Sequence, residues 1–146
     1  MGFKRILIAV DGSPIAAHAA DIGIALASCL KAEVAFIHVV VDTSNALGSL
    51  KLETAIDKPA TIAEQEGRNL LGAFRERAGT SPPALEFLET GRPAVKIVES
   101  ARCWPADVIV IASHGRGRIQ RLLLGSVAES VVRHAPCPVL VVRAQT

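Results

Sequence analysis

The chain has 146 residues, of which 50% are hydrophobic, 21% charged and only 3% aromatic, and its formal net charge is +2. This length suits one domain with a sizeable core, and the composition excludes an intrinsically disordered chain. No apolar run approaches the ~18 residues that a membrane-spanning helix requires, and the N-terminal apolar run is too short for a signal peptide. We therefore expect a single-domain cytoplasmic protein over residues 1–146 that does not enter a membrane.

The basic residues are unevenly distributed. From Ala112 to Thr146 there are five basic residues and one acidic residue, whereas the preceding part of the chain is slightly acidic. The chain has no tyrosine and few other aromatics, so it lacks the stacking surfaces of single-strand nucleic-acid binders. The basic excess therefore suits one small anion better than a nucleic acid.

The three cysteines, Cys29, Cys103 and Cys137, lie far apart and include no Cys-x-x-Cys pair. This pattern indicates neither a disulfide framework nor a zinc site, and reduced thiols are expected in the cytosol.

Apolar runs alternate with helical patterns along the whole chain. Strands are predicted at 3–10, 34–41, 85–89, 107–112 and 139–142. Helices are predicted from Ser13-Pro14 onward, at about 61–78, after the turn Gly91-Arg92-Pro93 as far as about residue 103, and at 126–134. The strand at 85–89 alternates apolar and acidic residues, which is typical of a sheet edge.

The helix boundaries have specific chemical signals. Ser13 is a favourable N-cap, Pro14 a favourable first helical residue, and Gly79 a favourable stop for the second helix. The apolar positions predicted to face inward in these two helices are Ile15, Ala19, Ile22, Leu26, Leu30, Ile62, Leu70, Leu71 and Phe74. Residues 42–59 show no periodicity and are expected to form a mobile loop or a short extra helix over a site.

Strands alternating with helices predict an α/β fold with a parallel sheet covered on both faces. In such sheets a ligand binds beyond the carboxyl ends of the strands, where the strand order reverses. Asp11, after the first strand, and Ala112, at the end of the fourth, are therefore the first places to look for a site.

The segment 112–130, ASHGRGRIQRLLLGSVAES, has the composition of a phosphate-binding loop. It contains neither the P-loop nor the G-x-G-x-x-G pattern. Gly115 and Gly117 allow a positive φ and a close approach of the backbone to a ligand. Gly125-Ser126 opens a helix, whose free N–H groups attract an anion.

Structural explanations exist for several of these residues. Ser126 and Glu129 fit a capping box, and Asp11 could hold the turn before the first helix. Arg116, Arg118 and Arg121 are either solvated charges or contacts to a polyphosphate. Within its apolar strand, His38 is expected to be a core residue, and His114 is expected to organise the loop.

Segment 112–130 resembles the ATP-binding signature of the universal stress protein family, G-x2-G-x9-G-[ST]. The similarity also includes ILIAVDGS, the strand ending in IHVV, GRPAVKIV and the C-terminal strand, so it covers nearly the whole chain. The resemblance implies an open five-stranded parallel sheet of order 3-2-1-4-5, similar to adenine nucleotide alpha hydrolases. It also implies a homodimer formed through the C-terminal strand. Some members of the family bind ATP and others do not.

The resemblance implies the following nucleotide-binding residues: Ala9, Val10, Asp11, Val39, Ala112, His114, Gly115, Arg116, Gly117, Gly125, Ser126 and Val127. Among them, Ala9 and Val10 would lie near the base, Val39 would form a wall for adenine, and Gly115 and Gly125 would contact phosphate. Asp11 is a candidate ligand for a magnesium ion on the triphosphate. Ala112 stands where the signature has its first glycine, and its methyl group would crowd the ligand if the backbone there needed a positive φ.

These observations predict an ATP-binding regulator or sensor of the stress response, with adenine nucleotide as its ligand and an unidentified downstream protein partner. The alternatives are a slow ATPase or phosphoryl-transfer protein, and a dimerisation module of the same fold with an empty cleft. The sequence shows no nucleophile paired with a base and no metal-ligand cluster, so no catalytic residue is assigned.

Overall fold

A computed structural model describes residues 2–41, 61–114 and 124–144 of the chain. Five strands form one parallel sheet of order β3-β2-β1-β4-β5. The strands are β1 (Arg5–Ala9), β2 (Glu33–Val41), β3 (Leu85–Gly91), β4 (Val108–Ala112) and β5 (Val139–Val142). The predicted strand order is confirmed, and β3 lies at a sheet edge as expected.

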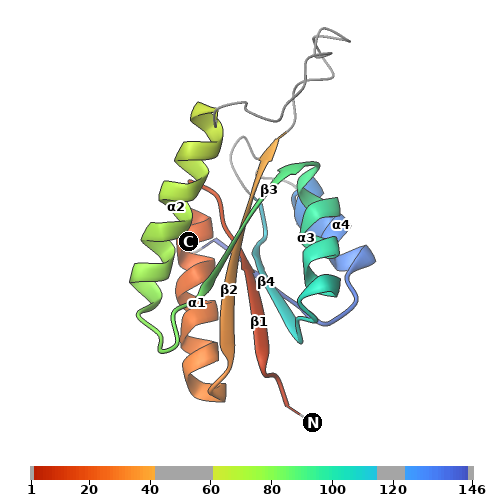
Figure 1. Cartoon of the computed structure of the whole chain (residues 1–146). Coiled ribbons are helices and arrows are strands. Elements are labelled where there is room, and N and C mark those ends of the chain that lie inside the picture. The colour runs from red at the N-terminus through yellow and green to blue at the C-terminus, as the bar shows by residue number, and fades with distance from the viewer. Residues whose placement is uncertain (1, 42–60, 115–123, 145–146) are drawn as a thin grey trace, which may run out of the picture.

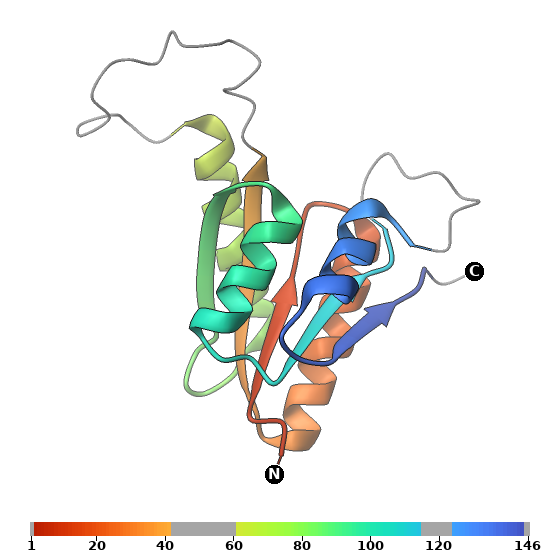
Figure 2. The ribbon, with the colours of Figure 1, turned by 90° about the vertical axis from the view of Figure 1, so that its right-hand side faces the viewer.

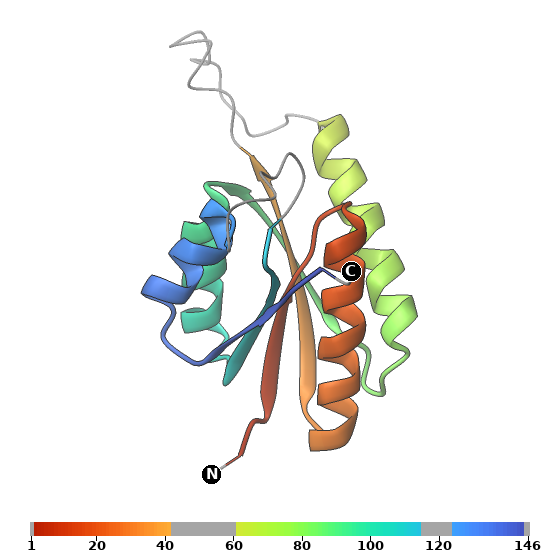
Figure 3. The ribbon, with the colours of Figure 1, turned by 180° about the vertical axis from the view of Figure 1, so that it is seen from behind.

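Four helices cover the two faces of this sheet (Figure 1). They are α1 (Pro14–Leu30), α2 (Ile62–Ala78), α3 (Pro93–Cys103) and α4 (Ser126–His134). Figure 2 looks onto the face covered by α3 and α4, and Figure 3, from behind, shows α1 and α2 together on the other side of the sheet. The fold is therefore a three-layer, doubly wound α/β arrangement.

Each sheet face has its own core because successive strand residues point to opposite faces. Ile6, Ile8 and Val110 pack with α1 and α2, whereas Leu7 and Ile109 pack with α3 and α4. Burial on both faces explains the continuous apolar runs of the central strands β1 and β4.

The helix ends follow the local sequence. The Ser13 side chain caps α1, accepting from the Ala16 N–H at 3.2 Å, with Pro14 as the first helical residue. Thr61 and Glu64 form a capping box at the start of α2, which Gly79 ends in the left-handed conformation. The predictions for Ser13, Pro14 and Gly79 are confirmed.

The predicted inward face of α1 is partly wrong. Ile22 and Leu30 are 39% and 41% exposed, and the buried stripe instead contains small residues such as Ala16, Ala20 and Gly23. A side-chain carbon added at Gly23 would lie 2.6 Å from Cδ1 of Ile8. Small residues thus let α1 lie close against the sheet, and the larger aliphatic residues flank the contact.

In α2 the predicted inward residues Leu71 and Phe74 are buried and Leu70 is half-buried, but Ile62 is 80% exposed. Ile62 is the first residue of the helix, and the sheet contacts of α2 involve later turns. Residues 42–59, predicted as a loop or short helix over a site, lie outside the described residues.

Candidate functional site

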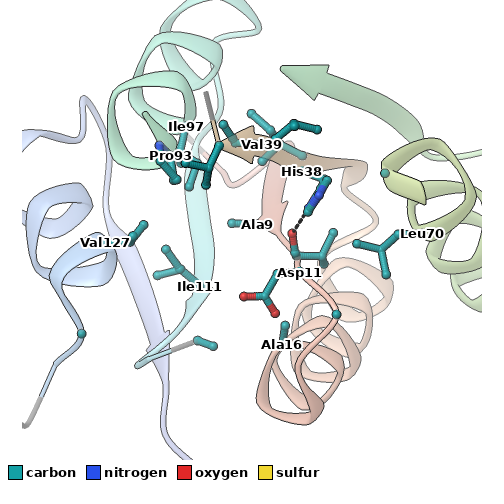
Figure 4. A pocket seen from close by; sticks show the side chains of 18 of the residues that line it. Ala9, Asp11, Ala16, His38, Val39, Leu70, Pro93, Ile97, Ile111 and Val127 are labelled. Carbon is teal, nitrogen blue, oxygen red and sulfur yellow. Dashed lines mark hydrogen bonds between the residues drawn. The ribbon is translucent and has the colours of Figure 1, made fainter. Parts of the chain in front are cut away.

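A pocket of about 980 Å³ lies beyond the carboxyl ends of β1, β2 and β4. This volume is sufficient for a ligand of nucleotide size. Strand order reverses between β1 and β4, and the pocket lies at this switch point, where ligands of open α/β sheets bind. Figure 4 shows labelled side chains converging on it from the strands and from the surrounding helices.

At the end of β1 a tight turn holds Asp11 in place. Oδ1 of Asp11 accepts hydrogen bonds from the N–H of Ser13 at 2.8 Å and from its hydroxyl at 2.5 Å. Asp11 therefore braces the turn, while Ser13 caps the helix. Oδ2 has no hydrogen-bond partner within the described part of the chain, and Asp11 lines the pocket.

The neighbouring strand, β2, extends further than β1. The last hydrogen bond between them joins the N–H of Val10 to the carbonyl of Ile37 at 2.9 Å, whereas β2 continues to Val41. Peptide groups alternate in direction along a strand, so the N–H and C=O of Val39 point toward the β1 side of β2, at a level where β1 has already ended. The edge of β2 at Val39 therefore presents one donor and one acceptor at the pocket.

His38 connects these two strand ends. Its Nδ1 lies 3.0 Å from the carbonyl oxygen of Val10, and the ring is half-buried beside the pocket (Figure 4). The sequence pattern predicted His38 only as a core residue. Its Nδ1 does have a partner, as expected, but the residue also lines the pocket.

On the opposite side of the pocket, α4 begins with an uncapped turn. Gly125 is the N-cap residue and has no side chain to cap with, and the first bond of the helix joins the Glu129 N–H to the Gly125 carbonyl. By helix geometry the N–H groups of Ser126, Val127 and Ala128 have no acceptor within the helix, and all three residues line the pocket. This helix start can attract an anion.

Two predictions for this turn are wrong. Ser126 is the first residue of α4 and not its N-cap, and Glu129 pairs with Arg133 at 3.3 Å, so they form no capping box. The N–H of Gly125 is also unavailable to a ligand, because it donates to the carbonyl of Ser113 at 2.6 Å. The free amides thus start one residue later than the sequence indicated.

Ser113 and His114 follow β4 and lie against this turn. The Ser113 side chain is buried, and its hydroxyl lies 3.0 Å from Nδ1 of His114. His114 lines the pocket, and its predicted role in organising the following loop concerns residues outside the described part of the chain.

Ala112 occupies an ordinary strand position at the end of β4, where it pairs with Val142. It is 7% exposed, and it belongs to the core cluster that also contains Ala19 and Ala20 of α1. Its methyl group therefore lies toward α1, away from the free amides of α4, which belong to the other face of the sheet. Ala112 is not among the described residues with positive φ, so alanine causes no backbone strain.

The structure brings most of the predicted site residues together around this one pocket. Those that line it are Ala9, Val10, Asp11, Val39, Ala112, His114, Gly125, Ser126 and Val127. Gly115, Arg116 and Gly117, together with Arg118 and Arg121, lie outside the described residues. Contact of any of these residues with a ligand remains a prediction.

Sequence reasoning missed the helices that form the pocket walls. Pro93 and Ile97 of α3, and Gly67 and Leu70 of α2, line it. The turn Gly91-Arg92-Pro93 was a usable signal, since it starts a helix at the carboxyl end of a strand. Nothing in the pattern of α2 distinguishes its pocket-lining residues from its other core residues.

The charged side chains among the described lining residues are the carboxylates of Asp11 and Glu66. No group of three or more His, Cys, Asp or Glu residues within 2–41, 61–114 and 124–144 has the arrangement of a metal site. A magnesium role for Asp11 therefore depends on oxygen ligands supplied by a bound nucleotide. Within the same ranges, no helix has the length and apolarity needed to cross a membrane.

The fold and the pocket define an open α/β protein with a pocket at its topological switch point and an uncapped helix start beside it. Residues 2–143 match the universal stress protein family, and the chain belongs to this family. The predicted family and fold are thus confirmed.

Curated relatives of similar length carry the same family name. A universal stress protein of Methanocaldococcus jannaschii is 39% identical over 143 residues, covering 97% of this chain and 82% of the relative. One from Thermus aquaticus is 38% identical over 144 residues, covering 97% of this chain and 99% of the relative.

Solved structures share the fold. Universal stress protein UspA from Lactobacillus plantarum is 28% identical, with a TM-score of 0.76, and the match covers 98% of this chain and 99% of that protein. A universal stress protein solved in complex with cAMP is 21% identical, with a TM-score of 0.76, and the match covers 99% of this chain and 100% of that protein.

Proposed function

We propose that this universal stress protein binds ATP in the switch-point pocket and acts as a nucleotide-dependent regulator in the cytoplasm. The observation that carries the proposal is the start of α4, where the N–H groups of Ser126, Val127 and Ala128 face a pocket of about 980 Å³ without an intrahelical acceptor. Free amides at a helix start favour phosphate.

The other end of the pocket suits a nucleoside. The peptide groups of Val39 offer one donor and one acceptor, which match the adjacent ring nitrogen and amino group of adenine. Asp11 follows β1, which lies between β2 and β4 in the sheet. Its Oδ2 is an acceptor for a ribose hydroxyl or a ligand for magnesium. The apolar side chains of Pro93, Ile97 and Ile111 complete the wall.

Ala112 is compatible with this proposal, because its methyl group belongs to the core cluster with α1. A universal stress protein that shares this fold was solved in complex with cAMP, which makes adenine nucleotides the first ligands to test. Free thiols at Cys29, Cys103 and Cys137 fit a reducing compartment.

Calorimetric titration with ATP and magnesium tests the proposal. We expect saturable heat and a rise in melting temperature with nucleotide concentration, because a ligand that binds only the folded state stabilises it. Absence of both at millimolar ATP would overturn the proposal and favour the empty dimerisation module. A slow ATPase has less support, because Ser113, whose hydroxyl lies 3.0 Å from Nδ1 of His114, is buried and does not belong to the described pocket lining. Phosphate release from bound ATP would favour it.

The open edge of β5 supports a homodimer. In the described sheet β5 pairs with β4 along one side, and Leu140 on β5 and Val132 on α4 are 37% and 46% exposed. An unpaired strand with exposed aliphatic neighbours favours strand-to-strand association. Light scattering of the purified protein should give twice the chain mass, and a Leu140→Lys variant should shift it toward the monomer.

A further inference from the structure

The end of β1 divides the pocket into two compartments. One borders α3 and α4 and contains Val39, Ile97 and Val127. The other borders α1 and α2 and contains His38 and Leu70. Figure 4 shows Ile97 and Val127 on one side of Asp11, with Leu70 on the other. We refer to the second part, which Val40, Ala63, Glu66 and Gly67 also line, as the α2 compartment.

In the proposed function, ATP occupies the first compartment. Adenine contacts the edge of β2 at Val39, in the plane of the sheet, and the phosphates bind at the start of α4, on the α3 and α4 side. None of the hydrogen bonds proposed for the nucleotide uses a residue of the α2 compartment.

The chemistry of the α2 compartment is defined by His38. The Val10 carbonyl can only accept a hydrogen bond, so Nδ1 of His38, 3.0 Å away, must carry a proton. In the neutral ring Nε2 is then an acceptor, and within the described part of the chain it has no hydrogen-bond partner. Gly67 lies beside this nitrogen: a side-chain carbon added there would be 3.6 Å from Nε2 and 2.9 Å from Cδ2.

The remaining lining is aliphatic with a negative charge at its rim. Leu70, Val40 and Ala63 supply apolar surface, and Glu66 on α2 supplies a carboxylate. The described lining residues of the whole pocket include no lysine or arginine. An acceptor, a carboxylate and an aliphatic wall together favour a ligand that donates hydrogen bonds, has positive charge and has a short apolar stem.

We infer that the α2 compartment is a second ligand site, which binds a small aliphatic amine with its ammonium group donating to Nε2 of His38. Glu66 contributes charge attraction, and the stem packs on Leu70 and Val40. The inference assumes the proposed function only for the position of ATP, because the amine site has its own residues.

The test uses n-butylammonium chloride as the probe and the full chain at pH 8, followed by backbone and histidine nitrogen NMR. We expect saturable shifts at the amides of Gly67 and Leu70 and at Nε2 of His38, with a dissociation constant on the order of millimolar for so small a probe. Pentanol, which is neutral, and butyrate, which is anionic, should bind at least roughly tenfold more weakly, as expected when a charge-assisted hydrogen bond is lost.

Two variants distinguish binding from a loss of structure. His38→Phe removes the acceptor and should weaken butylammonium roughly tenfold. Ala63→Phe, at an exposed position in the first turn of α2, should block the compartment without disturbing the core, whereas Gln65→Phe, exposed on the same helix but outside the pocket lining, should not.

The inference is wrong if butylammonium causes no saturable shifts, if butyrate or pentanol binds equally well, or if Ala63→Phe binds like Gln65→Phe. ATP titration of the same samples separates the two proposals. Amine binding without ATP binding supports the α2 compartment alone, and ATP binding without amine binding rejects it and leaves the proposed function intact.

Discussion

The N–H of Gly125 donates to the carbonyl of Ser113 at 2.6 Å, and this bond sets the start of α4 directly against the end of β4. A side-chain carbon added at Gly125 would lie 3.1 Å from Cα of His114 and 3.3 Å from the Ser113 carbonyl oxygen. Backbone atoms cannot move aside as a flexible side chain can. Glycine is therefore favoured here because it allows this close approach, even though its φ of −72° would suit other residues.

Gly125→Val should displace the first turn of α4 and move the amides of Ser126 and Val127 away from the pocket. We expect ATP affinity to fall at least roughly tenfold, equivalent to the loss of one or more charge-assisted hydrogen bonds. Calorimetry would measure the change, with Gly72→Ala on α2 as the matched control. An affinity equal to that of the wild type would show that this turn does not bind the phosphates.

Ala112→Gly tests the departure from the family signature. Removing a buried methyl group and adding backbone freedom should lower the free energy of unfolding by about 1–2 kcal/mol. Because the methyl group lies toward α1, ATP affinity should stay within about twofold of the wild type. Urea denaturation and calorimetry on the same preparation measure the two effects, and a large gain in affinity would mean that the methyl group obstructs the ligand.

Two glycines of α2 should respond oppositely to alanine. At Gly72 an added side-chain carbon meets no atom within 4 Å, so the substitution should stabilise the protein by about 0.5–1 kcal/mol. At Gly67 the added carbon would lie 2.7 Å from Cδ1 of Leu88, and the resulting overpacking should cost about 1–3 kcal/mol before the helix gain is counted. Urea denaturation checks both, and equal effects would contradict the packing of α2.

The ion pair between Asp21 on α1 and Arg77 on α2 should make stability depend on pH. Arg77 donates to both carboxylate oxygens, at 2.7 and 2.8 Å, and this hydrogen bonding lowers the pKa of Asp21 below 3.8. A lowered folded-state pKa adds stability above the pKa of the unfolded chain, and this stability is lost as the pH falls through the folded-state value. Because the side chains are 50% and 48% exposed, we expect less than about 1 kcal/mol.

A double-mutant cycle with Asp21→Asn and Arg77→Met isolates this pair from other effects. The coupling free energy should be present at pH 7 and should decline progressively as the pH falls below about 4, the ordinary pKa of an aspartate. A coupling that is unchanged at pH 3 would show that charge is not its source.

The order of the elements was predictable because each strand and helix has its own local signal. The apolar runs of β1 and β4, the Ser13-Pro14 start and the Gly79 stop all have direct structural counterparts. Hydrophobicity alone did not predict the buried side of α1, where small residues such as Gly23 make the contact because the helix lies so close to Ile8.

The site residues at the ends of strands and helices were predictable from the sequence. Those whose position depends on contacts between distant segments were not. Asp11, Ala112 and Ser126 border strand and helix ends, which the pattern locates. The capping box failed because Gly125 bonds to Ser113, a contact between segments that no local pattern specifies. The role of His38 in the pocket depends on β2 extending past β1 and on Gly67 lying beside the ring.

The orientation of Ala112 affects how other family members are sorted by sequence. A sequence search that requires glycine at the first signature position would class this chain with proteins that bind no nucleotide. The methyl group of Ala112, however, packs in the core cluster with α1. We expect nucleotide binding to depend on the size of the residue that faces α1 and on glycine at the position of Gly125, where an added carbon would meet main-chain atoms at 3.1 and 3.3 Å.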